Sequence, residues 1–282
     1  MPQAQDSTIR IRPYPDIMAE QPLERIRLYH RLREDGYVKK AEQYKTPKPD
    51  GDYRQRTLVI TWDRAPGARW ALNIPEHFGS HATKTHFGIK AWSWQVHSDQ
   101  HCTLINQTNE SKGELRCDYR VGDGCLNIEM NCTLDLENVL DDMMCQACFN
   151  HLWADGFGRN AYVLINGEFK PLCDEDPGDE IKWRRFIAIK GREDYGKYVW
   201  PVYHGAEGRF IATMRHGDDP LTIGFASPDA LAVAWSFWPC TDMDFALGAI
   251  GAGKAGKATA TLHFLPGTLE ENLDRVKISA ER

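Results

Sequence analysis

The chain has no apolar run that approaches the roughly 18 residues needed for a membrane-spanning helix. Its first residues, MPQAQDSTIRIRPYPDI, contain no apolar segment like that of a secretory signal peptide. Lysine and arginine together number 34 against 40 aspartate and glutamate residues, which gives a net charge of -6. That balance argues against a nucleic-acid partner, because binding phosphates requires a basic face. We therefore expect a cytoplasmic protein with no membrane and no nucleic-acid partner.

Two catalytic motifs are also missing, namely GxSxG of hydrolases and HExxH of metalloproteases. Eight cysteines are present, and without an export signal we expect free thiols. The spacing Cys145-x2-Cys148-x2-His151 offers zinc-ligand types, but no second cysteine pair follows it. Because positions 145 and 148 point to opposite faces of a strand, we do not expect these three side chains to converge on zinc.

Short runs rich in β-branched and aromatic residues follow one another from residue 57 onward, and turn residues separate them. Gly122-Asp123-Gly124 and Asn166-Gly167 each join two such runs, and both are typical of tight hairpins. This spacing predicts an all-β fold, an antiparallel β-sandwich, over residues 51–282. The clearest expected strands are TLVITW (57–62), WSWQVH (92–97), CTLINQT (102–108), AYVLI (161–165), RRFIAIK (184–190), RFIATMR (209–215), ALAVAWSFW (230–238) and KATATLHFL (257–265).

Helical patterns occur near both ends of the chain. Residues 1–50 form an N-terminal arm: residues 1–16 are polar and extended, and apolar residues recur at helical spacing over about 16–43. That amphipathic helix could cap the sandwich, support a homo-oligomer or dock on a partner subunit. Thr268 with Glu271 three residues later has the pattern of a helix N-cap, which predicts a short C-terminal helix.

Five of the ten histidines fall within 25 residues, interleaved with aromatic side chains. Imidazole titrates near neutral pH and is a common metal ligand, and indole offers a flat apolar face with a polar edge. Pro75, Gly79 and Gly88 favour a loop for this segment. We expect it to form one wall of a site for a small polar ligand such as a sugar. The residues concerned are His77, His81, His86, His97 and His101, with Trp92 and Trp94.

Three later segments could supply the other walls. His151 ends an expected strand and could act as an acid or base. Trp153 and Arg159 follow it; the indole could stack on the ligand, and the guanidinium could pair with a carboxylate. His204 and Glu207 follow an aromatic strand, YVWPVY. Trp238 precedes two acidic residues, Asp242 and Asp244, which could line the same pocket or belong to an ordinary solvated loop.

The stretch GDGCLNIEMNCTLDLENVLDDMMCQACFNHLW resembles the galactose mutarotase-like superfamily of sugar-handling β-sandwich proteins. Asn150-His151 is similar to the Asn-His pair of aldose epimerases, and LNIPEHFGSH is similar to their first histidine loop. The resemblance implies that His77 or His86 acts together with His151, with Glu207 in the place of a late glutamate. Leu152-Trp153 departs from the aromatic pair expected after the second histidine.

These observations together predict a carbohydrate-active enzyme that performs acid/base chemistry on a sugar or sugar acid, either as an epimerase or as a β-eliminating lyase. Histidines could instead hold a divalent metal, because neutral imidazole suits zinc, manganese or iron. The alternative is a non-catalytic carbohydrate-binding or assembly subunit of an enzyme complex. The candidate catalytic residues are His77, His86, His151, His204 and Glu207; the candidate substrate-binding residues are Trp92, Trp94, Trp153, Arg159 and Trp238; the candidate metal ligands are His77, His81, His86 and His151.

Overall fold

The computed structural model describes most of the chain from residue 56 onward and a few residues before it. The described residues are 8–13, 30, 33–34, 42, 56–80, 83, 85–108, 113–158, 160–172, 184–191, 202–236 and 240–281.

Two large sheets make up the described fold, as the sequence predicted. The first sheet has the strand order β1-β2-β3-β9-β17-β16-β12-β13, with β4 paired to β3. All its neighbours pair antiparallel except β12 and β13, which are parallel. Its strands are β1 (Ile9–Pro13), β2 (Thr57–Trp62), β3 (Arg69–Ser80), β4 (Thr85–His86), β9 (Leu140–Trp153), β12 (Arg184–Ile189), β13 (Val202–Ala206), β16 (Ala230–Ser236) and β17 (Cys240–Ile250).

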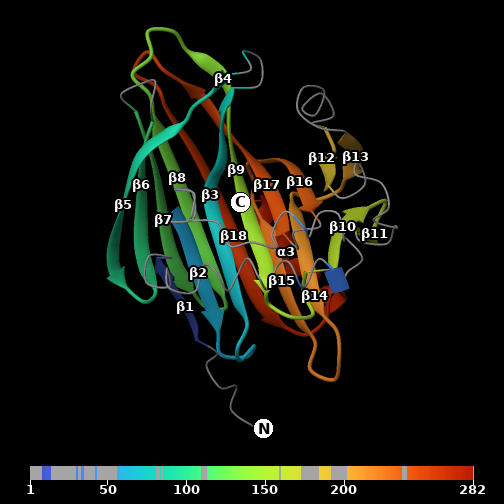
Figure 1. Cartoon of the computed structure of the whole chain (residues 1–282). Coiled ribbons are helices and arrows are strands. Elements are labelled where there is room, and N and C mark those ends of the chain that lie inside the picture. Colours follow the sequence, from blue (N-terminus) through green and yellow to red (C-terminus); the bar gives the residue numbers. More distant parts are fainter. Residues whose placement is uncertain are drawn as a thin grey trace.

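The second sheet has the order β11-β10-β14-β15-β18-β8-β7-β6-β5 and is antiparallel throughout. Figure 1 shows the long strands of both sheets running side by side, with α3 (Leu269–Glu281) beside β14 and β15. The strands of the second sheet are β5 (Ile89–Ser98), β6 (His101–Thr108), β7 (Glu114–Gly122), β8 (Cys125–Thr133), β10 (Ala161–Ile165), β11 (Glu168–Pro171), β14 (Phe210–Arg215), β15 (Leu221–Ala226) and β18 (Ala255–Pro266).

Alternation along the strands builds one apolar core between the sheets, because successive side chains point to opposite faces. β8 shows this directly, since Leu126, Ile128 and Met130 are buried while the residues between them are exposed. Trp70 of the first sheet contacts Phe264 of the second edge to face, with ring centroids 5.5 Å apart. Apolar residues from both sheets therefore belong to one core cluster.

The expected hairpins are confirmed. β7 and β8 pair from Gly122 opposite Cys125, and Gly124 in the turn has a φ of 63°. Asn166 and Gly167 have φ values of 53° and 77° between β10 and β11. Two consecutive residues with positive φ match the right-handed twist of the flanking strands, which explains the Asn-Gly pair.

One expectation of the sequence analysis is wrong, because the described histidines of the histidine-rich segment lie in strands and not in a loop. His77 lies in β3, His86 in β4, His97 in β5 and His101 in β6. Pro75 is accommodated because the register of β3 against β9 shifts between Asn73 and His77. Such an irregularity interrupts the ladder of backbone hydrogen bonds, so a proline lacking an N–H fits there.

The N-terminal arm differs in part from the expectation. Residues 9–13, expected to be extended, form strand β1, which pairs antiparallel with β2 from Ile9 opposite Trp62. The amphipathic helix expected over about 16–43 lies almost entirely outside the described residues. Within that range His30, Arg33 and Glu34 are helical.

The expected C-terminal helix is confirmed as α3 (Leu269–Glu281), and it packs on β14, β15 and β18. Glu271 donates its backbone N–H to Thr268 Oγ1 at 3.4 Å, and Thr268 donates its N–H to Glu271 Oε2 at 2.7 Å. This reciprocal pair satisfies two backbone donors at the helix start. Leu269 and Val276 bury the inner side of the helix in a small second cluster.

Replacing Thr268 with alanine is expected to lower the free energy of unfolding by about 1 kcal/mol, because the cap acceptor is lost. Chemical denaturation of the full chain measures this change. Thr268→Ser is the matched control, since it keeps the hydroxyl and should stay within about 0.5 kcal/mol of the parent. An equal loss of stability in both variants would contradict the capping role.

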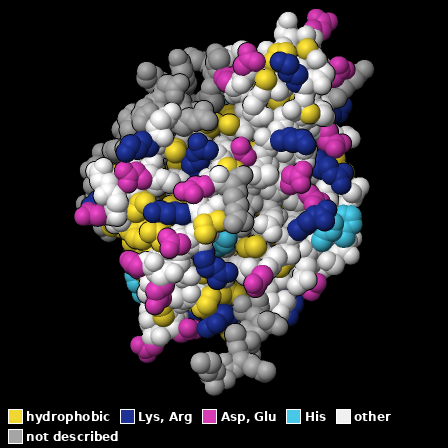
Figure 2. Space-filling model, turned by 180° about the vertical axis from the view of Figure 1, so that it is seen from behind, with side chains coloured by type: hydrophobic (Ala, Val, Ile, Leu, Met, Phe, Trp, Pro, Cys, Tyr) yellow, Lys and Arg dark blue, Asp and Glu magenta, His cyan; other side chains and the backbone are white. Residues whose placement is uncertain are grey.

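The surface seen in Figure 2 mixes charges of both signs. Lysine and arginine side chains alternate there with aspartate and glutamate, and no broad basic area appears among the residues coloured in that view. Within the described parts of the chain, no helix combines the length and the apolar character required to cross a bilayer.

Candidate functional site

The first sheet carries an unusually polar face, which is the one turned away from the second sheet. In β9, Cys145, Ala147 and Phe149 belong to the apolar core. Because side chains alternate, Gln146 and Cys148 point to the opposite face. We call this face, with its residues from β3, β4, β9 and β17, the polar face.

The same alternation holds in β17. Met243 and Phe245 lie in the core, so Asp242 and Asp244 belong to the polar face. Both carboxylates are buried, with 0% and 2% of their surface exposed. Buried carboxylates are rare unless they have partners or a functional role, so this part of the sheet is a candidate site.

Gln146 and Asp244 form the centre of the polar face. They pair directly in the β9–β17 register, and Gln146 Nε2 donates a hydrogen bond to Asp244 Oδ1 at 2.8 Å. The oxygen of this amide, Gln146 Oε1, is buried and accepts no hydrogen bond from any described residue. Buried acceptors are normally satisfied, so this one needs a partner, and a bound ligand or a water molecule could supply it.

Two of the predicted histidines lie at the edge of this centre. His77 pairs with Gln146 in the β3–β9 register, so both side chains share the polar face. His86 of β4 lies opposite Gly79, two residues after His77, and the two imidazole centroids are 6.4 Å apart. Both histidines are exposed. The structure therefore brings His77, His86, Gln146 and Asp244 onto one face.

The backbone of His204 falls in the same row as this centre. Pairings lead from Asp244 to Ala232 in β16, then to Ala188 in β12, and finally to His204 in β13. The side chain of His204 lies outside the described part of the structure.

Two thiols and a carboxylate form a second cluster on the polar face. The donor atoms of Cys148, Cys240 and Asp242 all lie within 4.8 Å of one another, and Asp242 pairs with Cys148 across the strands. Ser236 Oγ is 2.8 Å from Cys240 Sγ. Among the described residues this is the one group of three or more His, Cys, Asp or Glu donors spaced closely enough for a metal ion. The candidate ligands His77, His86 and His151 do not form such a group with one another.

Both thiols are protonated at neutral pH. The hydrogen bond that Cys148 donates to Cys240, and then burial, raise the pKa of the Cys148 thiol well above its ordinary value. Accepting that hydrogen bond lowers the pKa of Cys240, but burial and the charges of Asp242 and Glu76 outweigh it and raise the pKa. The seven described cysteines are free thiols, as expected.

His151 lies on the opposite side of the first sheet, toward the core. It is 1% exposed, its ring stacks edge to face on Phe149 at 4.7 Å, and its Nε2 is 3.1 Å from Thr241 Oγ1. Burial lowers the pKa of His151 to about 3. The structure therefore does not bring the neutral imidazole of His151 together with His77 and His86.

The predicted aromatic platforms lie apart from the polar face or outside the described residues. Trp92 and Trp94 are half-buried in β5 of the second sheet and pack against the core, and the Trp94 ring is 6.0 Å from Tyr119. Trp153 is half-buried at the end of β9. Three other candidates, His81, Arg159 and Trp238, lie outside the described residues.

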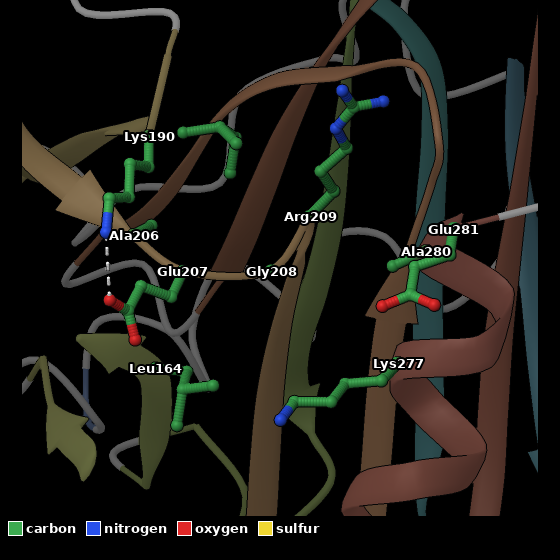
Figure 3. Close-up of a pocket in the computed structure, with 10 residues that line it drawn as sticks. Leu164, Lys190, Ala206, Glu207, Gly208, Arg209, Lys277, Ala280 and Glu281 are labelled. Carbon is green, nitrogen blue, oxygen red and sulfur yellow. Dashed lines mark hydrogen bonds and ion pairs between the residues drawn. The ribbon is translucent and has the colours of Figure 1, made fainter. Parts of the chain in front are cut away.

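Glu207 follows β13 and lines a separate open depression of about 600 Å³, which is bounded by β10, the ends of β12 and β13, and the C-terminal part of α3 (Figure 3). Its carboxylate accepts a hydrogen bond from the backbone N–H of Gly167 at 2.8 Å and forms an ion pair with Lys190 at 3.3 Å. The Gly167 hydrogen bond, followed by that from Lys190, lowers the pKa of Glu207. The carboxylate thus holds the start of β11 and faces Lys277 across the depression.

Four residues of the polar face stand out in the sequence and two do not. His77, His86, Asp242 and Asp244 were all noted from their types and neighbours. Gln146 and Cys240 were not, because β9 and β17 are buried on both faces and show no polar alternation in the sequence. Buried runs of this kind hide which residues share a face.

No family model and no curated protein sequence matches the chain. Solved structures do match it with low sequence identity. One is a galactose mutarotase-like protein from Lactobacillus casei, with 13% identity, a TM-score of 0.44 and coverage of 74% of this chain and 93% of that chain. A galactose mutarotase related enzyme from Lactobacillus acidophilus has 10% identity and a TM-score of 0.35, with 74% and 95% covered.

A third match is the α-N-acetylgalactosaminidase of Bifidobacterium bifidum, with 11% identity and a TM-score of 0.43 over 77% of this chain and 34% of that chain.

Proposed function

We propose that the chain is a carbohydrate-active enzyme that performs acid/base chemistry on a sugar or sugar acid at the polar face of the first sheet. The observation that carries the proposal is the row His77–Gln146–Asp244, in the middle of which the buried acceptor Gln146 Oε1 lacks a hydrogen-bond donor. His77 and Asp244 are the acid/base pair in this proposal, and Gln146 is the group that binds the substrate.

The spacing of the row suits a sugar ring. His77 and Asp244 stand on strands two apart, so their backbones are separated by about 9–10 Å. Gln146 and Asp244 are each 2% exposed, so a substrate reaches them only when the groups that cover them move aside. It would then have an imidazole on one side and a carboxylate on the other. A sugar hydroxyl can donate to Gln146 Oε1, which supplies the partner that this buried acceptor needs.

Acid and base on opposite sides of one substrate support two reactions. In an epimerisation, one group removes a proton and the other returns one from the opposite side. In a β-elimination, the base removes the proton next to a carboxylate while the acid protonates the leaving oxygen. His86 adjoins His77 and can exchange protons with it through a shared ligand or solvent. His151, which faces the core, has no part in this proposal.

A panel of free aldoses, uronic acids and oligosaccharides containing uronic acids tests the proposal on the full chain. Each compound is incubated in deuterated water and followed by NMR. We expect deuterium incorporation at a sugar carbon, or a new alkene signal, with at least one compound. Binding of sugars without any turnover would instead favour the carbohydrate-binding subunit, and the absence of both would overturn the proposal.

Gln146→Met is expected to weaken binding of the sugar identified in that panel by about tenfold, because methionine keeps the volume but removes a net hydrogen bond of roughly 0.5–1.5 kcal/mol. Isothermal titration calorimetry measures the Kd. Gln107→Met is the matched control, since Gln107 is exposed in β6 of the second sheet. Equal affinity in parent and Gln146→Met would contradict the role of this amide.

A further inference from the structure

Cys148, Cys240 and Asp242 form a cluster that the proposed sugar chemistry does not use. Cys148 and Asp242 pair directly across β9 and β17, and Cys240 lies two residues before Asp242 on the same face. All three are buried, with 7%, 4% and 0% of their surface exposed. Their donor atoms lie within 4.8 Å of one another, although the two cysteines are far apart in the sequence.

We propose that Cys148, Cys240 and Asp242 bind one thiophilic divalent cation of the zinc class. Two sulfurs and one carboxylate oxygen are a donor set that zinc accepts, with Zn–S bonds of about 2.3 Å and Zn–O bonds of about 2.0–2.2 Å. Tetrahedral geometry then separates the donors by about 3.5–3.8 Å. The donors in this structure lie within 4.8 Å of one another, so each pair must close by at most about 1.0–1.3 Å to reach that spacing.

The surroundings favour a soft cation. Asp244 lies on the same face two residues after Asp242, and the charge of Glu76 acts on both thiols, so the cluster lies in a negative field. Thiolates select zinc over calcium or magnesium, which prefer oxygen donors. On binding, each sulfur releases its proton to solvent as the bond to the cation forms.

The strands hold the donors firmly. β9 and β17 are central strands of the first sheet, with paired neighbours on both sides. Ser236 Oγ, 2.8 Å from Cys240 Sγ, fixes the orientation of that side chain from the next strand. Three protein donors leave one position of a four-coordinate zinc open, which is the arrangement of catalytic zinc sites. This inference goes beyond the proposed sugar chemistry and stands independently of it.

Metal titration tests the proposal directly. The full chain is stripped with a chelator, and Zn2+ binding is measured by competition with a chromophoric indicator. Co2+ is added to a second sample to detect sulfur-to-cobalt charge-transfer absorption. We expect one equivalent of metal and a clear charge-transfer band in the parent. A parent without that band would overturn the proposal, whatever the behaviour of the variants.

Substitutions locate the metal. Cys148→Ser and Cys240→Ser are each expected to weaken Zn2+ binding by more than about 100-fold, since loss of even an outer-shell partner typically costs 10–100-fold. Cys125→Ser is the matched control because Cys125 is half-buried in β8 of the second sheet, and it should bind like the parent. Equal weakening in all three variants would overturn the assignment.

A disulfide between Cys148 and Cys240 is the competing outcome. Alkylation of the denatured, unreduced protein followed by peptide mass analysis detects it, and a linked pair in the freshly purified chain would overturn the metal site. Sugar turnover is measured separately in each variant, so failure of the metal proposal and failure of the proposed sugar chemistry give different results.

Discussion

Asp244→Asn is expected to lower kcat for the sugar substrate by about 10²–10⁴-fold, the usual contribution of a positioned acid or base. Asparagine has nearly the shape of aspartate, and its amide oxygen can still accept the hydrogen bond that Gln146 Nε2 donates at 2.8 Å. The row on the polar face therefore keeps its geometry while the group that exchanges a proton is removed. Binding of the sugar should change much less than turnover.

Steady-state kinetics and calorimetric binding separate the two effects. The control is Asp141→Asn, because Asp141 is an exposed carboxylate near the start of β9 on the same sheet. We expect its kcat to match that of the parent. Unchanged kcat in Asp244→Asn would remove Asp244 from the proposed acid/base pair, and a loss in both variants would indicate a general effect of charge.

Acidification is expected to destabilise the fold between about pH 6.5 and pH 4 through two buried histidines. Burial lowers the pKa of His151 to about 3, and burial together with the charge of Arg275 lowers the pKa of His263 to about 4. Both values lie below the ordinary value of 6.5. In the unfolded chain each imidazole takes up a proton near pH 6.5, whereas in the folded chain it remains neutral.

The sign follows from proton binding. Above pH 6.5 both states are neutral at these sites, so neither histidine makes stability depend on pH. As the pH falls below 6.5 the unfolded state binds more protons, and each histidine lowers the free energy of unfolding by about 1.4 kcal/mol per pH unit. The loss amounts to roughly 3 kcal/mol per histidine by pH 4. It ends near pH 4 for His263 and near pH 3 for His151.

Urea unfolding at a series of pH values from 4.5 to 7.5 measures this slope. His151→Gln and His263→Gln should each remove about half of it, and the double variant should remove nearly all of it. The quantity compared is the slope of the free energy of unfolding against pH, and not the absolute stability. Each single variant therefore serves as the control for the other. A slope that both single variants leave unchanged would refute the linkage.

Much of the fold could be predicted from local patterns. The bounds of β2 coincide with TLVITW, and the turn Asn166-Gly167 lies where it was expected. The cap of α3 by Thr268 was also predictable. Turns, helix caps and side-chain alternation depend on residues close together in the sequence, so they can be recognised without a structure.

The histidine-rich segment shows where this local logic fails. Prolines and glycines predicted a loop, but the register shift between Asn73 and His77 allows Pro75 inside a long strand. Tertiary pairing with β9 outweighs the local preference there. His77 and His86 were selected from the sequence as candidate site residues, yet only the pairing of β3 with β9 and β4 shows that they share a face.

The amino-acid sequence by itself determined the fold class, the hairpins and the residue types available for acid/base chemistry, because these depend on side-chain alternation and on turns a few residues long. Only the tertiary structure decided which residues meet. Gln146 reaches Asp244 across 98 positions of the chain, and Cys148 reaches Cys240 in the same way. The register between β9 and β17 sets both contacts, and a shift of one residue would turn each side chain to the other face.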